Sequence, residues 1–156
     1  MLVRIEVDER ACTGCRLCEA VCSIAHEDGV GPGLARIWVL NTDLWGPRRV
    51  VVCRQCADPA CEKACPVGAI KVVTEESVRY VAVDRDLCVG CGACEDSCPY
   101  GAIAMHPDKP WPIKCDLCGG DPACVKYCAA GALSAATGSA PVRARERRLR
   151  LVKKGN

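Results

Sequence analysis

The chain has 156 residues with a formal charge of +2 at pH 7, and 16 of them are cysteine. Such a cysteine density is found in disulfide-stapled secreted domains, zinc modules and iron–sulfur proteins. Residues 1–8 are too short and too charged for an export signal, and no apolar run approaches the roughly 18 residues of a membrane helix, so we expect a soluble, cytoplasmic protein without membrane insertion.

Short strands and turns are predicted along the chain. Residues 2–7 alternate in polarity and predict a strand, and residues 36–40 and 48–52 predict a hairpin within a segment rich in Gly and Pro. Residues 69–73 and 78–83 predict a second hairpin around a polar turn. Short helical turns that end at a glycine, each followed by the start of a strand, are predicted at 65–70, 98–103 and 128–133.

The cysteines form four sets of four, a repeat that dominates the sequence. Two sets have the spacing C-x2-C-x2-C-x3-C, and they alternate with two in which the middle gap is expanded. In chain order the sets are Cys12, Cys15, Cys18 and Cys22; Cys53, Cys56, Cys61 and Cys65; Cys88, Cys91, Cys94 and Cys98; and Cys115, Cys118, Cys124 and Cys128.

This spacing is typical of [4Fe-4S] clusters. Three cysteines on a tight loop supply three corners of a cubane, and in two-cluster ferredoxins the fourth, followed by Pro, ligates the other cluster. The run from Cys88 to Pro99 matches this pattern without exception. Zinc ribbons instead bring together two separated C-x2-C pairs, so a structural zinc adaptor is the weaker alternative, and a disulfide scaffold weaker still. We therefore expect four [4Fe-4S] clusters as cofactors.

Over residues 2 to about 136 the chain resembles the four-cluster ferredoxin subunits that accompany molybdenum and tungsten oxidoreductases, hydrogenases and carbon monoxide dehydrogenases. The resemblance implies an α+β fold of two nested bacterial ferredoxin-like modules, with two clusters each, short helices and β-hairpins. Residues 1–25 and 105–138 would form the outer module, 53–104 the inner module, 26–52 an inserted hairpin or linker, and 139–156 a basic C-terminal tail. Ser23 and Ala129 depart from the pattern, because they replace the Pro after the fourth cysteine.

The resemblance also implies the ligand sets. One outer cluster would be held by Cys12, Cys15, Cys18 and Cys128, and the other by Cys115, Cys118, Cys124 and Cys22. The inner pair would be held by Cys53, Cys56, Cys61 and Cys98, and by Cys88, Cys91, Cys94 and Cys65. The alternative pairs the motifs consecutively, first with second and third with fourth.

The expected function is electron transfer rather than catalysis, because the sequence offers no catalytic acid, base or substrate pocket. The resemblance implies a subunit that relays electrons between a catalytic oxidoreductase subunit and a downstream acceptor such as a flavin subunit or ferredoxin. The chain is most like the small subunit of tungsten-dependent aldehyde oxidoreductases, and hydrogenase and carbon monoxide dehydrogenase partners look similar. A freely diffusing polyferredoxin is the alternative from another class.

Other residues receive a secondary role. His26 and His106 are interpreted as surface groups or as neighbours of the cluster ligands, and the aromatic residues as packing groups near clusters or a partner. With sixteen thiolates and four [4Fe-4S]2+ cores the formal charge becomes about −6, so the basic tail is expected to grip an acidic partner rather than nucleic acid. Higher-order assembly through such contacts is a further hypothesis. The aromatic residues concerned are Trp38, Trp45, Trp111, Tyr100 and Tyr127.

Overall fold

The computed structural model describes residues 3–41, 48–76 and 78–137. In this part of the chain eight short strands pair into four separate two-stranded antiparallel sheets. The strands are β1 (Val3–Val7), β2 (Ile37–Asn41), β3 (Arg48–Val52), β4 (Ile70–Glu75), β5 (Val78–Val83), β6 (Ile103–Met105), β7 (Pro112–Lys114) and β8 (Leu133–Thr137). The helices are α1 (Leu17–His26), α2 (Ala60–Lys63), α3 (Ala93–Ser97), α4 (Ala123–Lys126) and the 3-10 turn η1 (Leu117–Gly120).

One sheet joins the two ends of the described chain. Strand β1 pairs with β8, with Val3 opposite Thr137 and Val7 opposite Leu133. The other three sheets are local pairs, β2 with β3, β4 with β5, and β6 with β7. Among the described strands, only the β1–β8 sheet pairs segments that are far apart in the sequence.

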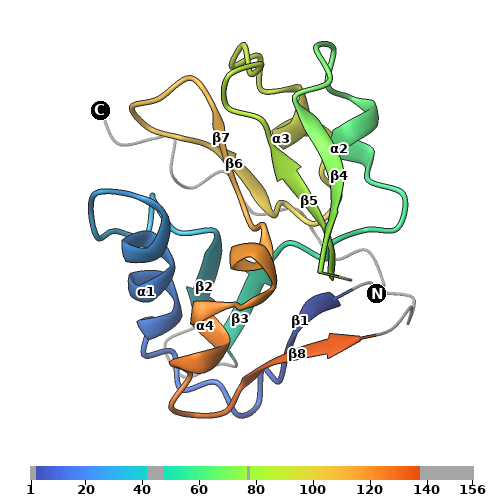
Figure 1. Ribbon diagram of the computed structural model, residues 1–156. Coiled ribbons are helices and arrows are strands. Elements are labelled where there is room, and N and C mark those ends of the chain that lie inside the picture. Colours follow the sequence, from blue (N-terminus) through green and yellow to red (C-terminus); the bar gives the residue numbers. More distant parts are fainter. Residues whose placement is uncertain (1–2, 42–47, 77, 138–156) are drawn as a thin grey trace.

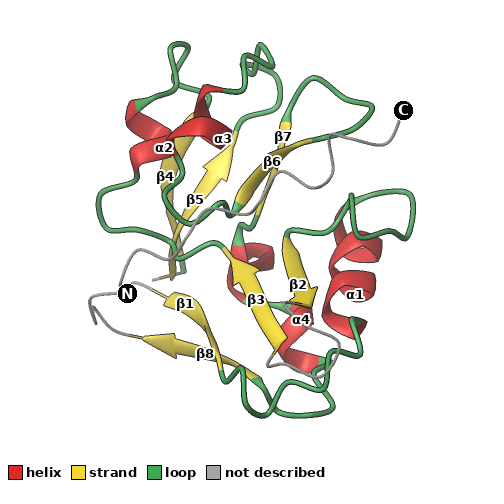
Figure 2. Ribbon diagram, turned by 180° about the vertical axis from the view of Figure 1, so that it is seen from behind, coloured by secondary structure: helices red, strands yellow, loops and turns green. Residues whose placement is uncertain are grey.

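The elements form two halves with the same plan (Figures 1 and 2). One half contains β4, β5, α2, α3 and the β6–β7 pair, and the other contains β1, β8, α1, α4 and the β2–β3 pair. Helix α2 packs against α3 in the first half, and α1 packs against α4 in the second. Each half therefore combines a two-stranded sheet, two packed helices and a second hairpin.

The core contains small aliphatic side chains and many cysteines. Ile5, Ile37, Val52, Val81 and Leu117 are each at most 1% exposed, and seven of the cysteines are also buried. The buried apolar residues form a single cluster that runs through both halves. Since the chain has no Phe, the cysteine-lined spaces take the place of bulky aromatic packing.

The strand predictions agree closely with the structure. Strands β3 and β5 have the predicted bounds, and β1, β2 and β4 lie within two residues of theirs. The predicted hairpins at 36–52 and 69–83 do pair. The strand starts predicted at 103 and 133 are confirmed as those of β6 and β8, but β7 and its pairing with β6 were not predicted, because three residues are too few to show a period.

The predicted helical turns after the fourth cysteines are wrong. Helices α2, α3 and α4 all end before the fourth cysteine of their motif, and a tight turn follows it. In each turn a glycine N–H donates to the cysteine carbonyl, from Gly68 to Cys65, Gly101 to Cys98 and Gly131 to Cys128. These three glycines have φ between 59° and 64°, a conformation that costs a residue with a Cβ.

Helix α1 differs because Ser23 replaces the proline. Without that ring the helix continues past Cys22 to His26, and the N–H of Glu27 still bonds the carbonyl of Ser23 at 2.8 Å. Ser23 is fully buried and its hydroxyl donates to the carbonyl of Ala20 at 2.9 Å. At Ala129 the missing proline changes nothing, since the turn there matches the other two.

Within the described residues, no helix combines the length and the apolar character needed to cross a membrane.

Candidate metal centres

The structure brings the cysteines together across motifs. Three pockets are each lined by the first three cysteines of one motif and the fourth cysteine of another. Group I is Cys65, Cys88, Cys91 and Cys94; group II is Cys53, Cys56, Cys61 and Cys98; group IV is Cys12, Cys15, Cys18 and Cys128. Three quartets therefore have the composition that the resemblance implied.

The remaining cysteines, Cys22, Cys115, Cys118 and Cys124, form group III. Burial, together with the neighbouring thiols of Cys22 and Cys118, raises the pKa of Cys124 to about 12. Cys115 is close enough to Cys124 to interact with it electrostatically. The fourth quartet therefore also gathers around one place, with its odd member coming from helix α1.

The four groups follow one another in a row. Helix α2 carries Cys61 of group II and ends before Cys65 of group I, and α3 carries Cys94 of group I and ends before Cys98 of group II. Between the halves, the thiol of Cys53 in group II interacts with that of Cys115 in group III. Cys18 of group IV is near Cys124 of group III. The order is therefore I, II, III, IV, with the II–III contact joining the two halves.

The two groups at the ends of the row reach the surface. Cys91 of group I and Cys15 of group IV are the exposed cysteines of the chain. Beside Cys91, the side chains of Val67, Leu87 and Val89 are between 41% and 62% exposed. Groups II and III, in contrast, each contain at least two buried thiols.

The donor sets fit metal ions or clusters that favour sulfur. Each group offers four thiols in an apolar setting, and burial raises the pKa of Cys18 and Cys61 to about 12 and of Cys94 to about 11. Thiolates are therefore costly at these places unless a positive core compensates their charge. Iron–sulfur clusters and zinc both supply such a charge, so the donors alone fit either.

Backbone N–H groups surround several of the sulfurs. Ala69 donates to Cys65 Sγ at 3.2 Å, Ala102 donates to Cys98 Sγ at 3.4 Å, and Arg36 donates to Cys22 Sγ at 3.3 Å. Burial would raise the pKa of Cys65, but the N–H groups of the turn that follows it outweigh this and lower the pKa. Such bonds stabilise negative charge on sulfur.

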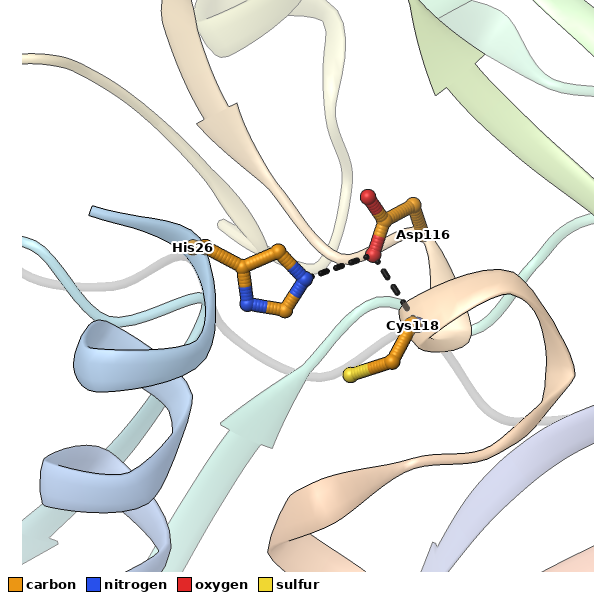
Figure 3. Close-up of side chains that lie close together, drawn as sticks. All are labelled: His26, Asp116 and Cys118. Atoms are coloured by element: carbon orange, nitrogen blue, oxygen red, sulfur yellow. Dashed lines mark hydrogen bonds and ion pairs between the residues drawn. The ribbon is translucent and has the colours of Figure 1, made fainter.

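His26 lies beside group III (Figure 3). Its Nδ1 donates to the carbonyl of Cys22 at 2.9 Å, and its Nε2 lies 3.2 Å from Asp116 Oδ1. The hydrogen bond to Asp116, followed by contacts with Cys118 and Cys22, raises the pKa of His26 to about 12. The imidazolium is therefore a positive group held against two cysteines of the quartet, which agrees with its interpretation as a neighbour of the ligands.

Asp116 connects the side chains and the backbone beside group III. It forms an ion pair with Arg36, and its Oδ1 accepts the backbone N–H of Cys118 at 3.0 Å. Burial would raise the pKa of Asp116, but His26 and Arg36 outweigh this and hold it below its usual range. By distance, His26, Asp116 and Cys118 could hold a metal ion (Figure 3). Because His26 and Arg36 already occupy the carboxylate and Cys118 belongs to group III, we do not regard the trio as a separate centre.

A repeated glutamate was missed in the sequence. The residue after the third cysteine is Glu19, Glu62 or Glu95 in three motifs, and each carboxylate accepts a backbone N–H from a strand. The donors are Val39, Val72 and Met105, at 2.6, 3.2 and 3.1 Å. The signal, Cys-Glu repeated three times, becomes visible when the motifs are aligned. These glutamates fasten each cysteine-bearing helix to its neighbouring hairpin.

The other residues singled out from the sequence are the aromatic residues and His106, and those that the structure describes pack against protein groups or lie at the surface. Tyr100 lines the pocket of group II, and Tyr127 is 59% exposed. Trp38 is buried in β2, and its indole N–H donates to the carbonyl of Pro32. His106 and Trp111 belong to a cluster of side chains around Glu27. Trp45 and the basic tail at 139–156 lie outside the described residues.

Residues 52–102 match the family of 4Fe-4S dicluster domains, and residues 10–28 match a family of 4Fe-4S binding domains. The chain is 40% identical over 131 residues to the polyferredoxin-like subunit of aliphatic sulfonate oxidoreductase from Pyrococcus furiosus, covering 82% of this chain and 74% of that protein. It is 41% identical over 113 residues to a tetrathionate reductase subunit from Archaeoglobus fulgidus, covering 71% of this chain and 52% of that protein.

A solved structure is also similar. The active-site complex BamBC of benzoyl coenzyme A reductase, with 1,5-dienoyl-CoA, contains a chain that is 27% identical, with a TM-score of 0.52. The similarity covers 94% of this chain and 83% of that chain. The curated relatives therefore vary in length, and this chain spans about half of the tetrathionate reductase protein but three quarters of the Pyrococcus protein.

Proposed function

Because the chain belongs to the polyferredoxin-like iron–sulfur subunits of oxidoreductases, which transfer electrons and are not the catalytic subunits, we propose that it carries single electrons through four [4Fe-4S] clusters. The clusters would connect a catalytic oxidoreductase subunit to a downstream acceptor. The observation that supports this best is the row of four cysteine groups with an exposed cysteine at each end.

The proposed ligand sets are groups I to IV. Each takes three cysteines from one motif and one from its partner motif, so the second and third motifs share groups I and II, and the first and fourth share groups III and IV. This exchange supports the nested arrangement, with 53–104 as the inner module and 1–25 with 105–138 as the outer one. The β1–β8 sheet, which closes the outer segments on each other, is consistent with that division.

When bound, each cluster would supply a site that accepts one electron and gives it up again. The chain's own residues control the setting of that site. Buried thiols exclude water, the N–H groups of Ala69, Ala102 and Arg36 stabilise charge on sulfur, and the His26 imidazolium adds a positive charge at group III.

A tungsten or molybdenum enzyme is the partner that we propose. This choice rests on the resemblance to subunits of such enzymes, with tungsten-dependent aldehyde oxidoreductase as the preferred case. The similarity to a chain of the BamBC complex and to a sulfonate oxidoreductase subunit widens the set of candidate substrates. The downstream acceptor would be a flavin subunit or a ferredoxin.

The test is anaerobic purification of the tagged chain from its native host, followed by mass determination and metal analysis. We expect a stoichiometric complex that contains tungsten or molybdenum, and whose substrate bleaches the visible absorbance of the iron–sulfur chain. A monomeric holoprotein without either metal would contradict the subunit assignment and favour a freely diffusing polyferredoxin.

A further inference from the structure

A closed ring of hydrogen bonds lies at the junction between groups II and III. The side-chain amide of Gln55 donates to the carbonyl of Cys115 at 2.9 Å, and its oxygen accepts the N–H of Val81 at 2.8 Å. The ammonium of Lys114 donates to the carbonyl of Val81 at 2.5 Å and to that of Cys115 at 3.0 Å. The ring therefore ties group II's loop, β5, β7 and the start of group III together.

The ring is fully enclosed. Gln55 is 0% exposed, Lys114 is 3% exposed, and Val81 and Cys115 are also buried. Gln55 stands between Cys53 and Cys56 of group II with φ of 48°, a strained conformation for a residue other than glycine. Strain of this kind persists where the surroundings fix the residue, and it is often found at functional sites.

Lys114 is a buried cation without an acidic partner. In the part of the chain that the structure describes, no carboxylate forms an ion pair with it. An uncompensated buried ammonium costs several kcal/mol. Its two hydrogen bonds go to neutral carbonyls and leave one of its three N–H donors for the group II pocket that it lines.

The missing negative charge is found in the cysteine groups. Four thiolates around an oxidised [4Fe-4S]2+ core leave a net charge of about −2, and one more electron makes it about −3. Lys114 acts electrostatically on Cys56 and Cys61 of group II and on Cys115 of group III. It is therefore placed to compensate charge on both sides of the junction.

Resting on the proposed four-cluster assignment, we propose that Lys114 is the internal counter-ion shared by groups II and III, where it favours the reduced state of both and supports electron passage between the two halves. When one electron moves from group II to group III, the first becomes oxidised and the second reduced, and no proton is exchanged. The total charge beside Lys114 stays constant during this step. Gln55 is the positioning residue, because it fixes the Cys115 carbonyl that Lys114 also bonds.

The test compares Lys114→Gln with Lys63→Gln in the full-length holoprotein. Glutamine keeps an amide donor for the carbonyls and removes the charge. Lys63 is the matched control, since it follows Cys61 on the same group II helix but is 65% exposed and pairs with Asp58. Iron and sulfide content are measured first, and then the midpoint potentials are obtained by redox titration followed by electron paramagnetic resonance.

We expect Lys114→Gln to make reduction of two of the four clusters at least tenfold less favourable, a fall of about 59 mV for one electron, while the other two remain unchanged. Lys63→Gln should leave all four unchanged, because an exposed charge is screened. Unchanged potentials in a fully loaded Lys114→Gln protein would overturn the proposal. A wild-type protein that lacks four clusters would instead refute the proposed function itself.

If Lys114→Gln loses iron, a second variant, Lys114→Arg, distinguishes the role of the charge from a packing role. Arginine keeps the positive charge and its donors. Recovery of iron content and of the wild-type potentials in Lys114→Arg supports the counter-ion, whereas loss of iron in both variants overturns it in favour of a packing role.

Discussion

The carboxylate of Glu19 accepts the backbone N–H of Val39 at 2.6 Å, which fastens helix α1 to the β2–β3 hairpin. Glu19 stands directly after Cys18 and is 4% exposed. Glu62 and Glu95 make the corresponding bonds in the second and third motifs, but the fourth motif has Val125 there. The fold thus uses one carboxylate per motif, three times, to hold cysteine-bearing helices in place.

Replacing Glu19 with Ala should therefore lower the free energy of unfolding by about 1.5–3 kcal/mol, the usual value for a hydrogen bond to a charged group. Guanidinium unfolding followed by circular dichroism and visible absorbance measures this. The control is Asp121→Ala, which removes an exposed pair with Lys126 and should cost less than about 1 kcal/mol. Equal effects of the two substitutions would contradict the anchoring role.

The exchange of ligands between motifs predicts selective damage. Cys22→Ala should perturb the cluster at group III and leave groups I and II nearly untouched, because its sulfur gathers with Cys124 and Cys118. Cys65→Ala is the matched control, and it should damage group I instead. Electron paramagnetic resonance spectra and the iron content of the two variants distinguish these outcomes. Loss at groups I or II in Cys22→Ala would mean that the motifs pair consecutively.

A cluster of ion pairs around the buried carboxylate of Glu27 joins the two halves at the end of α1. The carboxylate of Glu27 is 3% exposed and lies 2.7 Å from Lys109, 3.2 Å from Arg85 and 3.5 Å from His106. Both Arg85 and Lys109 also lie over the ring of Trp111. Burial would raise the pKa of Glu27, but the hydrogen bond from Lys109 and the charges of Arg85 and Lys109 outweigh it and lower the pKa.

A double-mutant cycle of Glu27→Gln and Lys109→Met should accordingly give a coupling free energy of about 0.5–3 kcal/mol. Unfolding of the two single variants and the double variant supplies the values. The exposed pair of Asp58 and Lys63 provides a reference cycle, for which we expect less than about 1 kcal/mol. Coupling no larger than in the reference cycle would show that Glu27 does not lock the halves together.

The tail at residues 139–156 lies outside the described residues, and its role stays a prediction from composition. It carries seven basic residues against one acidic residue, whereas the loaded body is expected to be acidic. Deleting it should weaken assembly with the partner and preserve iron content. The effect should shrink as salt shortens the Debye length from about 10 Å at 0.1 M to about 3 Å at 1 M. Light scattering after size exclusion tests this, and an unchanged assembled mass in truncated protein would contradict it.

The sequence revealed the cysteine groups better than their surroundings. Spacing and the resemblance predicted four quartets, and the structure brings the cysteines of each quartet together, while their role as cluster ligands stays a prediction. The strands were also visible, because β3 ends in three consecutive valines and β5 is rich in Val and Tyr, residues that favour strands. The helices were misplaced, because the glycine after each fourth cysteine has the pattern of a helix end, whereas α2, α3 and α4 stop before that cysteine.

Other features depend on contacts between distant segments and were not predictable. Gln55 bonds Cys115, sixty positions away, and Lys109 meets Glu27 across 82 positions. Neither residue has a local pattern that sets it apart from a solvated polar side chain. Lys114 looked like an ordinary strand lysine, and its importance arises only from its burial beside two cysteine groups.

The most direct test of the account is the count of iron and acid-labile sulfide per chain in anaerobically purified protein, with zinc measured in the same samples. Four cubanes predict about sixteen of each, in a brown protein whose absorbance bleaches on reduction. Stoichiometric zinc, or about half that amount of iron, would contradict the four-cluster relay.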